Sequence, residues 1–546
     1  QISGFGFKRV DAIMRKNNWP LNSPMRIRGA VFAALESAKG DNGHLYLEAE
    51  QLHKEAMSLL NSMIPVPQMR VKSDDLDAVI DDMLLHGKII NSDGNYYLVK
   101  TFAQEDETAR SIARLLCRPV ERVDVQDLLT RVRRQLGVEL SLRQTEAVHM
   151  VFRSDLSIIT GSPGTGKTTV LKAVIEVFKL LKPSEKILLA APTGRASRRM
   201  AESTGVNNAS TLHSLLGLFG EDGGFRKGEE DMLDAGLIIV DESSMMDMWL
   251  ARKFFSRIGP DTKVLLVGDA DQLQSVGAGN VFRELINCGL IPVTVLNEIF
   301  RQKKDSLIAY NAQKINNNDT SFFYGNDFTV CKCANQEEAA EHIRNIYLAQ
   351  VKQYGVDRVQ ILSPFRSTGA TSADQLNEAI RELVNPQTEE ADLKVGSLYF
   401  RVGDKIMQNK NSTKASNGDI GFIRSFRHDE RDGMRISIQF SPTRVVEYSM
   451  EEMGHVELAY ATTVHKAQGS EFDVVIFPLL RSHARMLTRS LVYTAITRAK
   501  AKVILVGQIG MLYMAVHKDD TGKRNTQLGR RITLYVNTFK VQKRSA

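Results

Sequence analysis

The segment 161–169, GSPGTGKTT, has the residue types and the spacing that bind a nucleoside triphosphate. It fits the pattern G-x-x-x-x-G-K-[S/T] and follows an apolar stretch at 156–160, the strand that this motif requires. The glycines let backbone N–H groups surround phosphate oxygens at the start of a helix. Lys167 is expected to neutralise charge on the β- and γ-phosphates, and Thr168 to hold Mg²⁺. The residues expected to contact the nucleotide here are Gly161, Ser162, Pro163, Gly164, Thr165, Gly166, Lys167, Thr168 and Thr169.

An acidic pair, Asp241 and Glu242, follows a second apolar segment at 237–240. Ligands of parallel sheets bind at the carboxyl ends of strands, so a strand over 237–240 would bring both carboxylates to the phosphate loop. Asp241 is expected to hold the Mg²⁺ shell, and Glu242 to act as the general base that polarises an attacking water. An isolated acidic pair is often only a solvated loop; the phosphate loop upstream favours the catalytic interpretation.

Short apolar segments that alternate with helix-like stretches must position these groups. The expected strands are 156–160, 187–191, 237–240 and 264–267 in one block, and 359–363, 474–477 and 503–506 in a second block. Such alternation is typical of parallel sheets with helical crossovers. The sequence therefore predicts an α/β protein with two related parallel-sheet domains.

Further polar motifs follow the expected strands in a fixed order. Gln272, in GDADQL at 268–273, follows the 264–267 strand, where its amide could sense a γ-phosphate. The other motif-like segments are LRQ at 142–144, APTGRA at 191–196, TLH at 211–213, EIFRQ at 298–302, TVHKAQGSE at 463–471 and YTAITRA at 493–499. This ordered set resembles the superfamily 1 helicases, and the wording of several motifs is most similar to the RecD-like helicases of the 5′→3′ subgroup. The resemblance covers nearly the whole chain, with specific core motifs and a loose match at the N-terminus.

The resemblance implies two RecA-like domains that bind ATP and Mg²⁺ in the cleft between them. Gln144 would then read adenine, and Gly469 and Glu471 would add contacts to the nucleotide. Arg301 and Arg498 would reach the transferred phosphoryl group, Arg498 as a finger from the opposite domain, a role that suits a planar guanidinium. The alternative for either arginine is a surface ion pair. The implied activity is that of an ATP-dependent DNA helicase in repair or recombination, with 5′→3′ movement implied by the resemblance alone.

Six residues are candidates for contact with a DNA strand that crosses the tops of both α/β domains. They are Thr193, Arg195, His213, Arg366, Thr463 and His465. Hydroxyls, guanidinium groups and imidazoles bind phosphates without reading sequence. The two histidines have no His or Cys partners at metal-binding spacing, and a buried, hydrogen-bonded histidine is the commoner alternative. The expected partners are single-stranded DNA and junctions of single-stranded with duplex DNA.

Two smaller features also resemble parts of RecD-like helicases. The glycine-rich stretch 217–233 would form a β-hairpin pin that splits the duplex, and a flexible loop is the alternative. The β-rich stretch 397–458 resembles a small SH3-like domain inserted in the second α/β domain. Lys405, Lys410 and Lys414 are expected to give this insertion a basic face, although a run of charges is usually only a solvated one.

The N-terminal part is expected to be helical. Residues 1–20 resemble part of a helix-hairpin-helix, with an ordinary turn before a helix as the alternative, and 21–135 read as helices followed by a winged-helix-like hairpin. The remaining expected boundaries are 136–301 for the first RecA-like domain, 302–396 with 459–546 for the second, and 397–458 for the insertion. The chain starts with Gln1 rather than Met, so we expect a processed chain or one piece of a longer product.

Bulk properties set the class of protein. A chain of 546 residues is long enough for about three or four domains. The net charge of +7, from 71 basic and 64 acidic residues, permits a polyanionic partner without requiring one. Four cysteines are too few for a disulfide framework, which favours a reducing, cytoplasmic compartment. The sequence has no signal-like start and no apolar run of about 18 residues, so we expect no membrane partner.

Two other functions compete with a DNA helicase. An RNA helicase of the same superfamily is one, because no residue clearly reads a 2′-hydroxyl. A motor subunit that works inside a repair, recombination or conjugation complex is the other. The sequence shows no acidic nuclease cluster and no tyrosine-rich relaxase segment.

Overall fold

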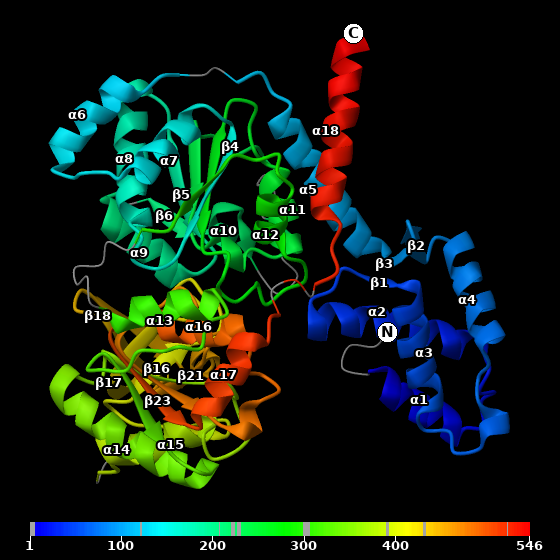
Figure 1. Ribbon diagram of the computed structural model, residues 1–546. Helices are drawn as coiled ribbons and strands as arrows, with labels where there is room; N and C mark the ends of the chain where they lie inside the picture. Colours follow the sequence, from blue (N-terminus) through cyan, green and yellow to red (C-terminus); the bar gives the residue numbers. More distant parts are fainter. Residues whose placement is uncertain are drawn as a thin grey trace.

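The structure is a computed structural model that describes residues 6–120, 123–206, 208–219, 224–225, 231–298, 306–388, 392–429, 433–520, 522 and 524–545. Two α/β bodies lie one against the other, and a helical N-terminal region flanks them (Figure 1). Among the described helices, none combines the length and the apolar composition needed to cross a bilayer.

The first α/β domain contains a six-stranded parallel sheet with the order β11-β4-β10-β9-β5-β6. Its strands are β4 (Leu156–Gly161), β5 (Ile187–Ala191), β6 (Ala209–Thr211), β9 (Leu237–Val240), β10 (Lys263–Gly268) and β11 (Val293–Leu296). Its helices are α6 (Gln126–Leu136), α7 (Leu142–Phe152), α8 (Lys167–Leu181), α9 (Gly194–Thr204), α10 (Leu212–Leu215), α11 (Met248–Phe255) and α12 (Val281–Asn287). Helices cover both faces, so the central strands are buried along their whole length, as a parallel sheet requires.

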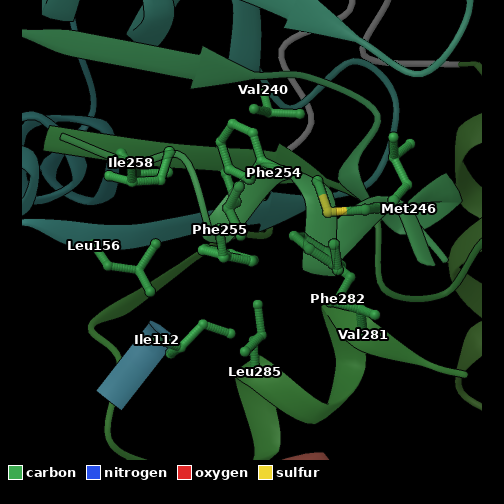
Figure 2. Packing of buried hydrophobic residues seen from close by; sticks show 14 of the residues in the cluster. Ile112, Leu156, Val240, Met246, Phe254, Phe255, Ile258, Val281, Phe282 and Leu285 are labelled. Carbon is green, nitrogen blue, oxygen red and sulfur yellow. The ribbon is translucent and has the colours of Figure 1, made fainter. Parts of the chain in front are cut away.

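The two faces of this sheet contribute to separate apolar clusters. One cluster joins α6, α7 and α8 to the sheet. Figure 2 shows the other, in which Phe254, Phe255 and Phe282 from α11 and α12 meet Leu156 and Val240 of the strands. Burial of such aromatic side chains contributes about 1.5–3 kcal/mol each. Packing on both faces of the sheet thus stabilises the strands whose ends carry the motif residues.

The second α/β domain has a five-stranded parallel sheet with the order β12-β23-β22-β13-β21. Its strands are β12 (Phe328–Lys332), β13 (Val359–Ser363), β21 (Ala461–Thr463), β22 (Phe472–Leu479) and β23 (Ala499–Gly507). Its helices are α13 (Leu307–Asn316), α14 (Gln336–Tyr354), α15 (Ala373–Val384), α16 (Arg489–Thr497) and α17 (Ile509–His517). Helices α14 and α15 pack on one face, and α13, α16 and α17 pack on the other.

A small antiparallel sheet is inserted between α15 and β21. It has the order β19-β18-β17-β16-β20. Its strands are β16 (Lys405–Gln408), β17 (Ile420–Asp429), β18 (Gly433–Ser441), β19 (Arg444–Ser449) and β20 (Val456–Leu458), and a hairpin of β14 (Leu393–Val395) and β15 (Leu398–Phe400) precedes it.

The N-terminal region is helical with a three-stranded antiparallel sheet of order β1-β3-β2. Its elements are α1 (Phe7–Lys16), α2 (Pro24–Asn42), β1 (Tyr46–Glu48), α3 (Ala49–Asn61), α4 (Ser73–Leu85), β2 (Ile89–Ser92), β3 (Asn95–Leu98) and α5 (Val99–Leu116). The C-terminal helix α18 (Leu528–Ser545) returns from the second α/β domain and lies beside α5 (Figure 1). The two ends of the chain thereby share one region of the fold.

The α/β class with two parallel sheets, the helical N-terminal region and the small β insertion are confirmed. The basic face expected of the insertion is wrong for Lys405, which is fully buried. Its ammonium donates to the carbonyls of Val356 and Val359 and to the side chain of Gln360, and burial lowers its pKa to about 7. Lys405 lies where the insertion meets the α/β domain. Its position in the sequence of an expected strand gave no indication that the residue is covered from both sides.

Candidate nucleotide-binding cleft and nucleic-acid path

The phosphate loop joins β4 to α8 in the expected strand–loop–helix order. Gly164 and Gly166 adopt φ angles of 86° and 81°, a left-handed backbone that favours glycine. The loop also holds itself in shape, because the hydroxyl of Thr165 donates to the Ser162 carbonyl at 2.8 Å. The ammonium of Lys167 donates to the carbonyls of Gly161 and Ser162, at 2.5 and 3.1 Å. An oxyanion in the loop is the natural competitor for that ammonium.

Asp241 and Glu242 follow β9, which β10 separates in the sheet from β4, the strand that precedes the phosphate loop. Burial and the neighbouring Glu242 carboxylate raise the pKa of Asp241 to about 6, so the site favours a cation beside it. Glu242 has a φ of 51°, an uncommon conformation for a residue with a side chain. Strained backbone of this kind is found at functional sites, where surrounding structure fixes it.

Gln272 and Asp269 are both buried at the end of β10. The Gln272 amide donates to Asp269 Oδ2 at 3.1 Å. The hydroxyl of Tyr493, from α16 in the second domain, donates to the same oxygen at 2.8 Å. Burial raises the pKa of Asp269, and the hydrogen bonds oppose that effect. A residue of each domain therefore converges on one carboxylate beside the phosphate loop.

Arg498 lies across the cleft from Lys167, at the end of α16, and only 2% of it is exposed. Its Nη1 donates to the Ser470 carbonyl at 3.2 Å, and its Nε is buried without a hydrogen-bond partner in the part of the chain that the structure describes. No carboxylate lies within ion-pair distance of Arg498 among the described residues. A buried, incompletely paired guanidinium fits an anion better than it fits a surface ion pair.

A cavity of about 1420 Å³ separates the two domains and brings these groups together. The predicted nucleotide and catalytic residues that line it are Pro163, Gly164, Gly166, Lys167, Thr168, Thr169, Asp241, Glu242, Gln272, Glu471 and Arg498. Gly161 and Ser162 line a smaller neighbouring cavity, also between the domains. The loop glycines, the lysine, the open hydroxyl of Thr168 and the acidic pair fit a triphosphate with its divalent cation.

Three further predicted nucleotide residues line neither of these two cavities. Gln144 is buried behind the phosphate loop, where its amide donates to the Thr165 carbonyl at 3.3 Å and accepts from the Ser141 backbone. Thr165 is buried within the loop, and Gly469 lies against Thr193. Adenine recognition by Gln144 stays a prediction; the observed contacts support the loop. Arg301 lies outside the described residues.

Sequence reasoning missed four basic or polar residues of the cleft. Arg199, Lys500 and Lys502 line the cavity. Arg199 and Lys500 pair with Glu471 at 2.8 and 3.4 Å, so Glu471 links α9 of the first domain to β23 of the second. Tyr493 was read only as part of a motif. The signal for Lys500 and Lys502 was their place two and four residues after Arg498.

The DNA candidates of the first domain lie near the seam between the domains. Thr193 caps α9, where its hydroxyl accepts from the Ala196 backbone N–H. The guanidinium of Arg195 lies over the Phe472 ring at 5.0 Å and donates to the Glu471 carbonyl. These contacts indicate that Arg195 joins the two domains, and its contact with a phosphate stays a prediction.

The second-domain candidates follow β13 and β21. Thr463 ends β21, and its hydroxyl accepts from the Lys466 backbone. Arg366 is 63% exposed, with Glu457 at 3.3 Å as its nearest carboxylate. An exposed guanidinium with a weakly held partner is free to exchange it for a phosphate. Both residues stay predictions as DNA contacts.

His213 and His465 are half-buried, and burial lowers the pKa of each. The ring of His213 lies 6.0 Å from the Trp249 ring, and its Nδ1 is buried without a hydrogen-bond partner from any described residue. Within the described part of the chain, no group of three or more potential metal ligands surrounds either ring.

The hairpin expected over 217–233 is described in part. Its strands β7 (Leu218–Phe219) and β8 (Gly224–Phe225) pair antiparallel, and 220–223 and 226–230 lie outside the described residues.

Comparisons with known proteins agree with this geometry. The matching family models are the ATP-dependent RecD2 DNA helicase HHH domain at 1–46, an AAA domain at 144–278, the ATP-dependent RecD-like DNA helicase SH3 domain at 376–440 and the UvrD-like helicase C-terminal domain at 458–506. The ATP-dependent RecD2 DNA helicase of Deinococcus radiodurans is 30% identical over 539 residues, which cover 97% of this chain and 72% of that protein. The RecBCD enzyme subunit RecD of Mycolicibacterium smegmatis is 29% identical over 69% of this chain and 72% of its own.

Solved structures give a weaker likeness. The Pif1 helicase from Candida albicans aligns with 74% of this chain and 99% of its own length at 18% identity, with a TM-score of 0.43.

Proposed function

The chain belongs to the RecD-like family of ATP-dependent DNA helicases. We propose that it uses Mg²⁺ and ATP to move 5′→3′ along single-stranded DNA. Duplex separation at junctions of single-stranded with double-stranded DNA follows from that movement. The expected setting is intracellular DNA repair or recombination, alone or with protein partners.

The observation that carries the proposal is the cavity between the two parallel sheets. One wall bears the phosphate loop, the acidic pair and Gln272, and the other bears Arg498 with Glu471. A motor needs this division, because hydrolysis at a site shared by two bodies changes how tightly they close.

In this mechanism the loop N–H groups and Lys167 hold the phosphates, and Thr168 and Asp241 would hold Mg²⁺. The cation, when bound, neutralises charge that develops on the phosphate oxygens. Glu242 takes the proton of the attacking water, as its place beside the cavity allows. Arg498 stabilises the transferred group from the opposite wall, and its departure after hydrolysis would let the domains open.

Strand separation in a tailed duplex tests the proposal and its direction together. Wild-type protein should unwind a duplex with a 5′ single-stranded tail and leave one with a 3′ tail or blunt ends intact. Lys167→Ala is the matched control, because it removes phosphate charge at a loop tip and should abolish both ATP hydrolysis and unwinding. Unwinding only from a 3′ tail would overturn the direction, and equal activity of Lys167→Ala would overturn the nucleotide site.

The same protein preparation tests the alternative that the chain is an RNA helicase. ATP hydrolysis is measured with single-stranded DNA and with RNA of the same sequence and length. Strong stimulation by DNA and little by RNA is expected. The reverse order would assign the chain to RNA.

A further inference from the structure

Four side chains of the second domain contact one short segment of the first, residues 269–273. Tyr493 donates to Asp269, and the hydroxyl of Thr494 accepts from the Leu273 backbone N–H at 2.8 Å. The Gln468 amide donates to the Leu273 carbonyl at 3.0 Å, and Asn316 donates to Asp271 at 2.9 Å. Gln272 lies inside this segment. The second domain therefore holds the segment at both of its ends.

Tyr493 has the most direct of these contacts to the nucleotide site. Its side chain is fully buried, and its hydroxyl donates to Asp269 Oδ2, the oxygen that also accepts from the Gln272 amide. The Ser162 side chain, in the phosphate loop, interacts with the same hydroxyl. One phenol thus bridges the second domain to the phosphate loop and to the carboxylate that holds Gln272.

We infer that Tyr493 is a positioning residue for ATP hydrolysis, which fixes Gln272 through Asp269 when the two domains close. The inference rests on the proposed function and adds a route by which closure reaches the γ-phosphate. When the domains separate, the phenol leaves Oδ2, and the Oδ2 side of the Asp269 carboxylate loses the hydrogen bond from the second domain. The Gln272 amide, which donates to the same oxygen, then loses its fixed orientation. Hydrolysis would therefore be fast only in the closed arrangement.

The structure gives a reason why the hydroxyl, rather than the ring, does this. Van der Waals packing of the ring places α16 against the cleft, and phenylalanine preserves it. A hydrogen bond to a carboxylate is among the stronger ones in proteins, and it needs a donor at one position. Asp269 keeps the Asp271 backbone N–H at 3.1 Å on its other oxygen, so only the Oδ2 side is affected by Tyr493.

Tyr493→Phe, which removes the hydroxyl alone, is the first test. We expect the Kd of a fluorescent ATP analogue and the KM for ATP to stay within about two-fold of wild type, because Lys167 and Thr168 are untouched. DNA-stimulated kcat should fall by about 10-fold or more, the scale of one lost hydrogen bond to a charged acceptor. The matched control is Tyr347→Phe, which removes a buried tyrosine hydroxyl in α14 that has no hydrogen-bond partner among the described residues. It should leave kcat unchanged.

A second comparison asks whether Tyr493 acts through Gln272. If it does, Tyr493→Phe combined with Gln272→Ala should be no slower than Gln272→Ala alone, because the route is already broken. Multiplied losses in the double variant would mean that Tyr493 acts independently, and would overturn the inference. A kcat for Tyr493→Phe equal to that of Tyr347→Phe would overturn it as well.

A third pair keeps the test decisive if Tyr493→Phe does not fold. Thr494→Ser retains a hydroxyl acceptor for the Leu273 N–H, whereas Thr494→Val removes it at similar volume. Loss of DNA-stimulated kcat in the valine variant with recovery in the serine variant supports clamping of the segment, and equal rates refute it. A wild-type chain without ATP hydrolysis would instead overturn the proposed function and this inference with it.

Discussion

Replacing Arg498 by lysine separates a phosphoryl-stabilising finger from an ordinary charged residue. Lysine keeps the positive charge and a similar length but lacks the planar fork of donors. We expect Arg498→Lys to bind ATP and single-stranded DNA normally, to lose most DNA-stimulated hydrolysis and to lose all detectable unwinding.

The size of the effect follows from the surroundings of Arg498. The guanidinium is almost fully buried at the cavity wall and donates to the Ser470 carbonyl, and its Nε meets no acceptor within the described ranges. An arginine finger contributes about 10³–10⁵ in rate in NTPases. An ammonium would retain part of the electrostatic effect, so we expect a loss of about 10²-fold or more in DNA-stimulated kcat.

The assays are steady-state ATP hydrolysis with saturating single-stranded DNA and unwinding of a 5′-tailed duplex, both on one preparation of each variant. Arg358→Lys is the matched control, because Arg358 is in the same domain, 62% exposed, and paired with Asp473 at 3.4 Å. Exposed pairs are worth only about 0–1 kcal/mol, so this control should behave as wild type. Wild-type rates for Arg498→Lys in both assays would refute the reasoning.

Four further expectations follow from the structure. Glu242→Gln should keep nucleotide binding while hydrolysis falls by about 10²-fold or more; loss of nucleotide binding by a folded variant, seen in equilibrium titration, would contradict the base role. Affinity for single-stranded DNA should fall steeply as salt rises and vary little with sequence, as a fluorescence titration at several ionic strengths would reveal. Burial lowers the pKa of His483 to about 4, so between about pH 6.5 and 4 the unfolded chain binds a proton at this histidine that the folded chain does not. The stability of the fold should therefore decrease as the pH drops from about 6.5 toward 4. A His483→Gln variant should show a flatter dependence of thermal unfolding on pH. Glu105 is fully buried and paired with Arg531 of α18, so Glu105→Ala should cost about 3–5 kcal/mol and expose α18 to proteolysis, whereas an unchanged cleavage pattern would mean that the pair does not hold the helix.

The sequence predicted which residues of the first domain meet at the cleft, for a reason that lies in the sheet. The phosphate loop, Asp241 and Gln272 each follow an apolar strand, and parallel strands end at a common edge. Spacing from those strands was therefore enough to bring the residues together. The opposite wall was predicted only through the resemblance, because nothing in the spacing says which edge of the second sheet faces the first.

Contacts between distant segments could not be predicted. The amide of Gln144 donates to the Thr165 carbonyl of the phosphate loop, 21 residues further along the chain, and its recognition of adenine stays a prediction. Arg195 has the residue type of a phosphate contact, yet it stacks on Phe472, more than two hundred residues further along the chain. Residue type predicts what a side chain is able to bind, whereas packing between domains decides what it meets.

Residues 524–527, between α17 and α18, form a C-terminal arm that shows why that distinction matters for coupling between the domains. Arg524, which follows α17, donates to the carbonyls of Ser275, Gly277 and Gly279 at 2.7–2.8 Å, just beyond Gln272. The Gly279 backbone N–H in turn donates to the Gly43 carbonyl in the N-terminal region, and a side chain at position 43 would collide with the Arg524 guanidinium. The stretch 269–279 is therefore held by the second α/β domain at its start and by the C-terminal arm and the N-terminal region at its end. Because protein interiors are close-packed and transmit strain, we expect a movement of any of these three parts to be felt at Gln272 through this stretch.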